Sequence, residues 1–387
     1  MKFNKISKAF YVHIPFCPSG CKFCHFYLDG EKKGGYVDLL RKEYKIKFWN
    51  NRTEVDCIHI WWGTPNMLSL KEMDDLLLFL SETLVWYKEF SIELHPALLS
   101  YELLDILNVR WIDRISFWIQ TLDERILQEH TRVDVNYEKL WEYLFYAKKL
   151  WIKKINFDFI YDLIGDTIQN INDNFSFINT YQPTSVNYYP LRILTSFLKK
   201  KYKFSEKRRV VFYKYILYQF KKTVYTRKNN AIYCLEGFKW GENFLYEEII
   251  YSHNHILYGL WVSAVSHIWK QFQKNIITYS DYQKCILNWK LPSNLTFNLS
   301  NIPFLLYRFY YLLLMHNNIS LNLFDKRYGR GSLSKIKLYI DELINHDLLI
   351  KTTEIIQVTE KGVYYFETIE NILFQNFSQE INLLRKL

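Results

Sequence analysis

Short runs of apolar and β-branched residues alternate, along the first half of the chain, with longer stretches whose apolar residues recur every three or four positions. The first pattern predicts strands and the second predicts amphipathic helices. Six runs are predicted strands: 10–14, 56–60, 90–94, 113–119, 154–160 and 185–191. The predicted helices between them include YVDLLRKEYKIKF, LSLKEMDDLLLFLSETL, LLSYELLDIL and YEKLWEYLFYAKKL.

This alternation predicts an α/β fold with a parallel sheet and helices outside it. Ligands of such folds bind at the carboxyl ends of the strands. The distinctive short motifs fall there, since three cysteines follow the first predicted strand, WWGTP the second, ELHP the third and WIQT the fourth. We therefore expect the functional site along that edge of the sheet.

The chain of 387 residues is longer than one ordinary domain, and its pattern changes twice. Residues 1–195 carry the strand and helix alternation. Residues 196–300 are less regular and rich in aromatic side chains, and we interpret them as an extension that packs on the sheet. Residues 301–387 predict helices, a hairpin and a final helix, which is the pattern of a winged-helix-like module. No helix in this module has a basic face, so we interpret it as a packing cap and expect no nucleic-acid binding.

Composition limits the environment of the protein. The formal charge is +10, and the only dense basic run, KKKYKFSEKRR at 199–209, is interpreted as a solvated face. No apolar run reaches the roughly 18 residues of a membrane span, and the chain shows no signal-peptide pattern. Six cysteines, three of them clustered, do not form the pattern of a disulfide framework. We expect a soluble protein of the reducing cytoplasm.

The clustered cysteines are Cys17, Cys21 and Cys24, spaced C-x3-C-x2-C directly after the first predicted strand. A structural zinc site normally has four ligands in two pairs, and the chain has no second pair. Three thiolates leave one position of a metal centre open, and thiolates suit iron-sulfur chemistry. The other three cysteines are isolated along the chain and are interpreted as buried or incidental: Cys57, Cys234 and Cys285.

The cysteine spacing, with Phe23 before the third cysteine, resembles the cluster loop of the radical S-adenosylmethionine (SAM) enzymes. Further motifs occur in the order of one subgroup, oxygen-independent coproporphyrinogen III dehydrogenase and its relatives, which include haem chaperones. These motifs are YVHIPFC, GTP at 63–65, E-x-x-P at 93–96, R-I-S-x-x-x-Q at 114–120, N-x-D-x-I-Y at 156–161 and YPL at 189–191. The resemblance implies a partial (βα)6 radical SAM barrel that holds a 4Fe-4S cluster and SAM, whose reductive cleavage yields a 5′-deoxyadenosyl radical.

The resemblance also implies a role for individual residues. Cys17, Cys21 and Cys24 would each bind one iron of the cluster. Glu93 could accept a hydrogen bond from the SAM ammonium, and Arg132 could pair with its carboxylate. The remaining implied contacts of SAM or a second ligand are Phe23, Trp62, Gly63, Thr64, Gln120 and Asp158. The implied catalytic residues are Tyr11, Glu93 and Gln120.

Each of these polar residues, taken singly, could also make an ordinary hydrogen bond at a strand end. His13 and His25 lie close to the cysteines in sequence, and we interpret them as structural.

Two functions from different classes remain open. One is an oxidoreductase that abstracts hydrogen from a tetrapyrrole, and the other is a haem chaperone that binds and delivers haem. The chain begins close to its first predicted strand, as haem chaperones do, but the histidine motif expected near their haem site is not cleanly reproduced around Ser252 to His255. The resemblance implies a tetrapyrrole or haem ligand and an electron donor such as flavodoxin or ferredoxin.

Tryptophan occupies positions where the family has glycine: Trp61, Trp62, Trp111, Trp118, Trp151 and Trp261. The chain has only 12 glycines and as many tryptophans, whereas glycine usually supplies about 7% of residues. One hypothesis is that the gene uses UGA for glycine and has been translated with a code that reads UGA as tryptophan. The other is a degenerate protein that has lost SAM binding, because two indoles would fill the space beside the second strand.

Overall fold

A parallel sheet forms the centre of the computed structural model, which describes residues 6–25, 34–150, 152, 154–229, 232–235, 244–252 and 255–377. All six predicted strands are confirmed: β1 (Ser7–Ile14), β3 (Cys57–Gly63), β5 (Glu89–Leu94), β6 (Arg114–Gln120), β7 (Lys154–Tyr161) and β8 (Ser185–Pro190). They pair in this order and all in parallel. The α/β class and the partial barrel predicted from the sequence are therefore present.

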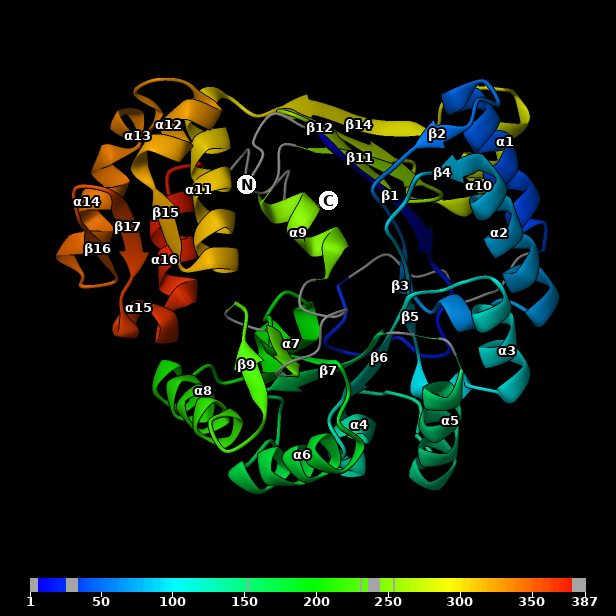
Figure 1. Ribbon diagram of the computed structural model, residues 1–387, viewed down its shortest axis with the longest axis horizontal. Coiled ribbons are helices and arrows are strands. Elements are labelled where there is room, and N and C mark those ends of the chain that lie inside the picture. Colours follow the sequence, from blue (N-terminus) through cyan, green and yellow to red (C-terminus); the bar gives the residue numbers. More distant parts are fainter. Residues whose placement is uncertain are drawn as a thin grey trace.

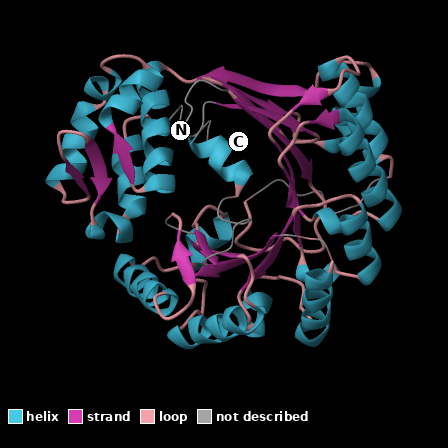
Figure 2. Cartoon of the chain, viewed as in Figure 1, coloured by secondary structure: helices cyan, strands magenta, loops and turns pink. Residues whose placement is uncertain are grey.

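Helices follow the strands and cover one side of the curved sheet (Figures 1 and 2). They are α1 (Tyr36–Phe48), α2 (Leu70–Thr83), α3 (Tyr101–Val109), α4 (Glu124–Glu129), α5 (Tyr137–Lys149) and α6 (Ile168–Tyr181). Local sequence sets where they begin. At α2, the Ser69 hydroxyl accepts the Glu72 N–H at 3.3 Å, and the Glu72 carboxylate accepts the Ser69 N–H at 2.9 Å. This reciprocal pair satisfies two backbone donors that a helix start leaves open.

Both edges of the sheet are extended by the segment between 196 and 300. Beside β8 lie β10 (Ile232–Leu235) and β9 (Tyr225–Arg227), and beside β1 lie β11 (His255–Leu260), β12 (Val265–Ile268), β13 (Gln271–Asn275) and β14 (Ser293–Asn298). The new strands are antiparallel to their neighbours except β11, which runs parallel to β1. The helices of this segment are α7 (Ser196–Lys201), α8 (Glu206–Phe220), α9 (Leu245–Ser252) and α10 (Tyr279–Leu287). A separate two-stranded pair, β2 (Thr53–Glu54) and β4 (Leu84–Val85), lies in the first half of the chain.

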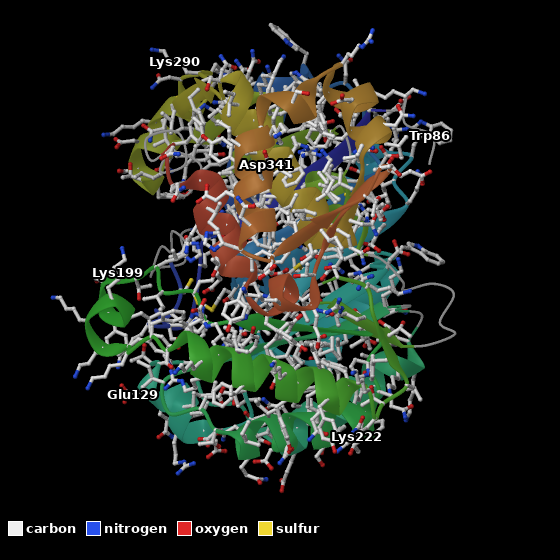
Figure 3. The ribbon with its side chains drawn as sticks, turned by 90° about the vertical axis from the view of Figure 1, so that its left-hand side faces the viewer. Trp86, Glu129, Lys199, Lys222, Lys290 and Asp341 are labelled. Atoms are coloured by element: carbon white, nitrogen blue, oxygen red, sulfur yellow. The ribbon has the colours of Figure 1, made fainter. Side chains whose placement is uncertain are left out.

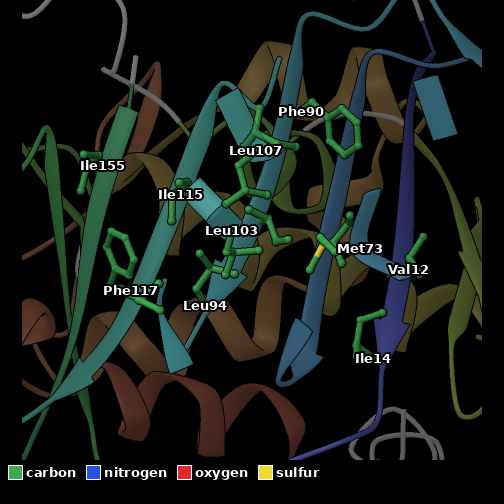
Figure 4. Packing of buried hydrophobic residues seen from close by; sticks show 14 of the residues in the cluster. Val12, Ile14, Met73, Phe90, Leu94, Leu103, Leu107, Ile115, Phe117 and Ile155 are labelled. Carbon is green, nitrogen blue, oxygen red and sulfur yellow. The ribbon is translucent and has the colours of Figure 1, made fainter. Parts of the chain in front are cut away.

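The two faces of the parallel sheet differ in chemistry. Alternate residues such as Val12, Ile14, Phe90, Ile115 and Phe117 pack under the outer helices in one apolar core (Figure 4). The residues between them point to the inner face, where α9 lies (Figure 1). Many inner-face residues are polar and buried: His59, Ser91, Glu93, Arg114, Ser116, Asn156, Asp158 and Asn187. Because successive strand residues face opposite sides, this alternation separates a packing face from a face for chemistry.

The predicted winged-helix-like module is confirmed at the C-terminal end (Figure 1). Its helices are α11 (Asn301–His316), α12 (Leu321–Tyr328), α13 (Ser332–Lys335), α14 (Lys337–Asn345), α15 (Glu360–Tyr364) and α16 (Phe366–Phe374). A three-stranded sheet of β15 (Asn318–Ser320), β17 (Ile355–Val358) and β16 (Leu349–Lys351) accompanies them. The module has its own apolar core, centred on residues such as Leu306, Phe309 and Leu343.

The basic run at 199–209 is only partly the solvated face expected from the sequence. Lys199 is exposed and projects from α7 (Figure 3). Arg209, by contrast, is buried, and its guanidinium donates to Asp162 at 2.9 Å and to the Leu191 carbonyl at 2.7 Å. It also donates to Glu367 of α16, at 2.5 Å. Arg209 therefore joins the C-terminal module to the sheet, which a linear charge count could not reveal.

The described residues contain neither a membrane-spanning helix nor a disulfide. Their helices include none with the length and apolar character required to cross a membrane. Their cysteines form no disulfide, since Cys17, Cys21, Cys24, Cys57 and Cys285 are all free.

Candidate cofactor site

The cysteine loop leaves the carboxyl end of β1 and is held against the end of α4 by backbone contacts. The Lys22 N–H donates to the His130 carbonyl at 2.9 Å, and the Thr131 hydroxyl donates to the Gly20 carbonyl at 2.9 Å. From the segment after β8, the Thr195 hydroxyl donates to the Lys22 carbonyl at 2.7 Å. Three separate parts of the chain thus determine where the loop lies.

Hydrogen-bond donors lie beside the sulfurs of Cys17 and Cys21. The Thr64 hydroxyl donates to the Cys17 sulfur at 3.3 Å, and the Arg132 guanidinium lies 3.8 Å from the Cys21 sulfur. Donors and positive charge stabilise thiolates over thiols. Both donors were singled out from the sequence, and the structure brings both to the cysteines.

This donor set fits a 4Fe-4S cluster. Thiolates are the usual ligands of such clusters, and hydrogen bonds to the sulfurs tune them. Within the described residues, no three His, Cys, Asp or Glu side chains converge on a single ion position. A cluster does not require that convergence, because the three thiolates would bind three different irons.

Gly63 closes β3 beside the loop and has to be glycine. Its φ is +66°, and a β-carbon there would lie 1.7 Å from the Ile14 carbonyl oxygen. The pairing of β1 with β3 shifts at this point, from His13 opposite Trp61 to Ile14 opposite Gly63. Trp62 is the extra residue of this bulge, which brings the backbone before Thr64 close to β1.

The indoles of Trp61 and Trp62 cover the inner face of β1. Their ring centroids lie 4.5 Å apart, and Trp62 stands edge-on to Tyr11 at 5.6 Å and to His13 at 5.5 Å. The Tyr11 hydroxyl lies 3.2 Å from Nδ1 of buried His13. Tyr11 and His13 therefore sit under the indoles, in the space beside the cysteine loop.

Glu93 is a buried carboxyl at the end of β5, and His59 of β3 lies 3.5 Å from it. Burial, followed by the charges of Asp158 and Glu247, raises the pKa of Glu93 well above its usual value. Burial and the charge of Asp158 likewise raise the pKa of Glu247, on α9, to about 8. Three carboxyls from β5, β7 and α9 thus face one interior space. A cation in that space would favour their ionised forms.

Asp158 lies at the centre of a hydrogen-bonded ladder across three strands. Its carboxylate accepts from Ser116 at 3.0 Å, from Asn156 at 3.0 Å and from Asn187 at 2.7 Å. Burial raises its pKa to about 6, and these three bonds oppose that rise. The ladder fixes the carboxylate in one orientation on the inner face.

Arg132 and Gln120 lie near the end of β6. The Arg132 side chain is buried, and it also donates to the Trp118 carbonyl at 2.5 Å. Gln120 is buried with φ +69°, where β6 and β7 shift register. A residue with a β-carbon rarely adopts that backbone, and such strain is commonly found at functional sites.

Phe23 and His25 belong to the cysteine loop. Phe23 packs against His130 at 5.4 Å, in a small apolar cluster beside α7. Burial, together with the charges of Arg192 and Lys274, lowers the pKa of His25 to about 4. Of the other cysteines, Cys57 is buried in β3 and Cys285 lies in α10. Cys234 lies in β10, and its side chain is outside the described part of the structure.

Sequence reasoning missed most of the inner face. The predicted Glu93 and Asp158 are surrounded by His59, Ser116, Asn156, Asn187 and Glu247. Ser116 and Asn156 belong to the motifs at 114–120 and 156–161, although the resemblance gave them no role, and no motif marks the other three. A signal was present in the strands, because polar residues occupy every second position of NFD at 156–158 and of SVN at 185–187. That spacing identifies one face of a strand.

Comparisons with known proteins show what the chain is similar to. Residues 11–178 match the Radical SAM superfamily. The heme chaperone HemW of Lactococcus lactis subsp. lactis is 27% identical over 397 residues, which cover 96% of this chain and 98% of that protein. The oxygen-independent coproporphyrinogen III oxidase of Helicobacter pylori strain J99 is 30% identical over 174 residues, but these cover 42% of this chain and only 38% of that protein.

A solved structure shows the same fold over nearly the whole chain. Coproporphyrinogen III oxidase (HemN) from Escherichia coli, described as a radical SAM enzyme, superposes with a TM-score of 0.81. The superposition covers 95% of this chain and 90% of that one at 18% identity. The chain therefore contains a radical SAM domain, whose cofactors are a 4Fe-4S cluster and SAM, and it is similar to the HemW and HemN proteins.

Proposed function

We propose that the thiolates of Cys17, Cys21 and Cys24 hold the 4Fe-4S cluster and that the protein uses SAM there in porphyrin or haem metabolism. The observation that carries the proposal is the meeting of Thr64 and Arg132 with the sulfurs of Cys17 and Cys21. When bound, the cluster and SAM supply one-electron cleavage of a carbon-sulfur bond, which gives methionine and a 5′-deoxyadenosyl radical.

Arg132 and Glu93 would orient SAM through its charged groups. The guanidinium of Arg132 is buried beside Cys21 and would pair with the carboxylate of SAM. Glu93 would accept a hydrogen bond from the ammonium group, and this positive charge would offset the burial that now raises its pKa. Because these two residues have opposite charges and each would bind a different charged group of SAM, together they would fix the orientation of its methionine part.

The polar ladder of the inner face would orient the rest of the ligand. Asp158, held by Ser116 and Asn187, would accept hydrogen bonds from ribose hydroxyls. Gln120 would contribute from the end of β6, and Phe23 and Gly63 would lie on the adenine and methionine sides. Burial of these groups excludes water, so their hydrogen bonds are stronger than at the surface.

The first candidate reaction is oxidation of a tetrapyrrole, as in coproporphyrinogen III oxidation. The similarity to the Helicobacter pylori oxidase over 174 residues supports it. The reductive cleavage of SAM that would start such a reaction takes one electron from the cluster, and we propose a flavodoxin or ferredoxin as its donor and the cytoplasm as compartment. The free cysteines of the described residues are compatible with a reducing compartment.

The second candidate is a haem chaperone that keeps the cluster and SAM but delivers haem. The observation favouring it is the coverage of the Lactococcus lactis HemW protein, because that similarity includes the C-terminal module as well as the radical SAM domain.

One experiment separates the two candidates. The reconstituted protein is incubated anaerobically with SAM, dithionite and coproporphyrinogen III, and in parallel with haem. Decarboxylated product would support the oxidoreductase, and stoichiometric haem binding without product would support the chaperone. Absence of SAM cleavage in both arms, with the cluster intact, would contradict the shared proposal.

A further inference from the structure

Seven of the ten tryptophans among the described residues have a left-handed backbone, with φ between +52° and +93°. They are Trp49, Trp62, Trp86, Trp111, Trp261, Trp269 and Trp289. Fifteen non-glycine residues of the described chain have such a φ, so nearly half of them are tryptophan, although tryptophan supplies only 12 of 387 residues. A β-carbon is unfavourable in this conformation, glycine adopts it freely, and a bulky residue there is an outlier.

Trp111 occupies the position after α3 where helices most often have glycine. Its N–H donates to the Asn108 carbonyl at 3.1 Å, and the N–H of Ile112 donates to the Leu107 carbonyl at 3.0 Å. This pair of bonds defines a Schellman motif, with Trp111 at its left-handed residue. The same bonds recur at 3.1 and 3.0 Å after α10, from Trp289 to Ile286 and from Lys290 to Cys285.

Three more tryptophans lie at other turns that favour glycine. Trp49 caps α1 with φ 52° and ψ 35°, and its N–H donates to the Lys45 carbonyl at 2.9 Å. Trp269 is the first of the two residues that join β12 to β13, a loop position commonly occupied by glycine or asparagine. Trp62 is the extra residue of the bulge in β3. In each case the position of the residue in the backbone is one that favours glycine.

Exposure shows that several of these indoles contribute little packing. The exposed fractions are 84% at Trp49, 80% at Trp86, 76% at Trp111 and 62% at Trp289. Trp86 projects from the surface in Figure 3. Tryptophan is among the more buried residue types on average. At these four positions the indole is mostly exposed, so burial of its apolar surface cannot compensate for the unfavourable left-handed backbone.

Trp261 is fully buried and crowded. Its ring centroid lies 4.1 Å from that of Tyr36 and 4.7 Å from that of Tyr282, and its φ is +93°. Within the described residues, its indole N–H has no hydrogen-bond partner. A buried indole normally has one. The backbone of Trp261, by contrast, is well placed, since its N–H donates to the Glu43 carboxylate at 2.7 Å and its carbonyl accepts from the Asn275 amide at 2.8 Å.

Trp141 differs from the seven. It lies inside α5, and its ring packs against Phe177 at 4.6 Å and Phe145 at 5.7 Å. This is an ordinary environment for tryptophan.

We infer that the functional protein has glycine at the seven left-handed positions, because its own translation system reads their codon as glycine. The backbone identifies four positions that family resemblance did not: Trp49, Trp86, Trp269 and Trp289. The resemblance had also indicated Trp61, Trp118 and Trp151, of which the first two have no left-handed φ and the third lies outside the described residues. With glycine at position 62, the space over Tyr11 and His13 beside the cysteine loop opens.

The test compares full-length chains with a matched control. One gene carries the seven changes Trp49→Gly, Trp62→Gly, Trp86→Gly, Trp111→Gly, Trp261→Gly, Trp269→Gly and Trp289→Gly, and a second carries only Trp141→Gly. We expect the urea midpoint of unfolding to rise for the first and fall for the second. Two further variants keep a single tryptophan, Trp111 or Trp261, and have glycine at the other six positions. Comparing each with the sevenfold variant tests that one site, even where the unsubstituted chain folds poorly. A lower midpoint for the sevenfold variant than for the unsubstituted chain would overturn the inference.

A second readout is independent of folding. The codons at the seven positions are expected to be UGA and the codon of Trp141 to be UGG, with glycine found by mass spectrometry in the corresponding peptides of the natural protein. UGG at most of the seven positions, or tryptophan in those peptides, would overturn the inference.

Discussion

The hydroxyl of Thr64 lies 3.3 Å from the sulfur of Cys17, although 47 residues separate them along the chain. Thr64 follows the second strand of the parallel sheet and Cys17 follows the first, so the pairing of β1 with β3 brings them together. This contact connects the cysteine loop to the neighbouring strand end.

Thr64→Val should lower the reduction potential of the cluster. A hydrogen bond to a ligand sulfur stabilises the more negative reduced cluster, and valine removes the donor while keeping the shape. Thr64→Ser keeps the hydroxyl and should stay near the unsubstituted value. A redox titration followed by electron paramagnetic resonance measures both, and equal potentials for Val and Ser variants would contradict the assigned bond.

Replacing Cys17, Cys21 or Cys24 by alanine should abolish the cluster, because each thiolate holds one iron. Cys57→Ala and Cys285→Ala should leave iron content and brown absorbance unchanged, since Cys57 is buried in β3 and Cys285 lies in α10. Iron analysis after anaerobic reconstitution measures the effect. Full iron content in Cys21→Ala would show that other ligands hold the metal.

Gly63→Ala should destabilise the protein by roughly 3 kcal/mol or more, because it combines left-handed strain with overpacking. The added β-carbon would lie 1.7 Å from the Ile14 carbonyl oxygen. Gly165→Ala is the matched control: its φ is +87°, but the nearest atom would lie 3.8 Å away. The control should lose only about 1–2 kcal/mol. Urea unfolding compares the two variants. An equal loss of stability in both would mean that the β1 backbone shifts to accommodate the added methyl group.

Arg132→Gln should weaken SAM binding roughly tenfold to a hundredfold, as expected when a buried charged hydrogen bond is lost. Arg132→Lys keeps the positive charge but loses the two-pronged hydrogen bonding of the guanidinium. Its affinity for SAM should therefore lie between those of Arg132→Gln and the unsubstituted protein. Arg110→Gln is the control, because Arg110 pairs with Asp74 away from the site, at 2.6 and 2.8 Å. Equilibrium binding of SAM to the reconstituted protein measures all three. Unchanged affinity in Arg132→Gln would remove Arg132 from the site.

Asp158→Asn should change how stability depends on pH. Burial raises the pKa of Asp158 from 3.8 to about 6, so its stabilising contribution is present below pH 3.8 and is lost as pH rises through 6. The variant lacks this loss, so its stability relative to the unsubstituted protein should increase between pH 4 and 7. The increase should be at most about 3 kcal/mol, at 1.36 kcal/mol per pKa unit.

Asp74→Asn supplies a control of opposite sign for that measurement. The hydrogen bond from Arg110 lowers the pKa of Asp74, so its contribution is gained as pH rises. Its variant should lose stability relative to the unsubstituted protein as pH rises toward 3.8, and the difference should change little above that pH. Urea unfolding of SAM-free protein at several pH values measures both, and parallel curves for the Asp158 variant and the unsubstituted protein would contradict the raised pKa.

Local sequence was sufficient to predict the strands and helices of the radical SAM domain and the order of the C-terminal module. Their apolar periods of two and 3.6 residues are local properties, and so is the spacing of Cys17, Cys21 and Cys24. The segment between 196 and 300 could not be predicted in the same way, because its strands join opposite edges of the sheet. Whether β11 pairs with β1 depends on strand order, which no local pattern contains.

By itself, therefore, the sequence determined the α/β class, the cysteine loop, the motifs at the strand ends and the excess of tryptophan over glycine. Only the tertiary structure decided which side chains meet. Strand register placed Asp158 between Ser116 and Asn187, and the loop after α4 placed Arg132 beside Cys21. The structure also showed which tryptophans have a backbone suited to glycine. The physical reason is that a period or spacing describes neighbours along the chain, whereas hydrogen bonds, burial and φ angles depend on segments that are distant in sequence.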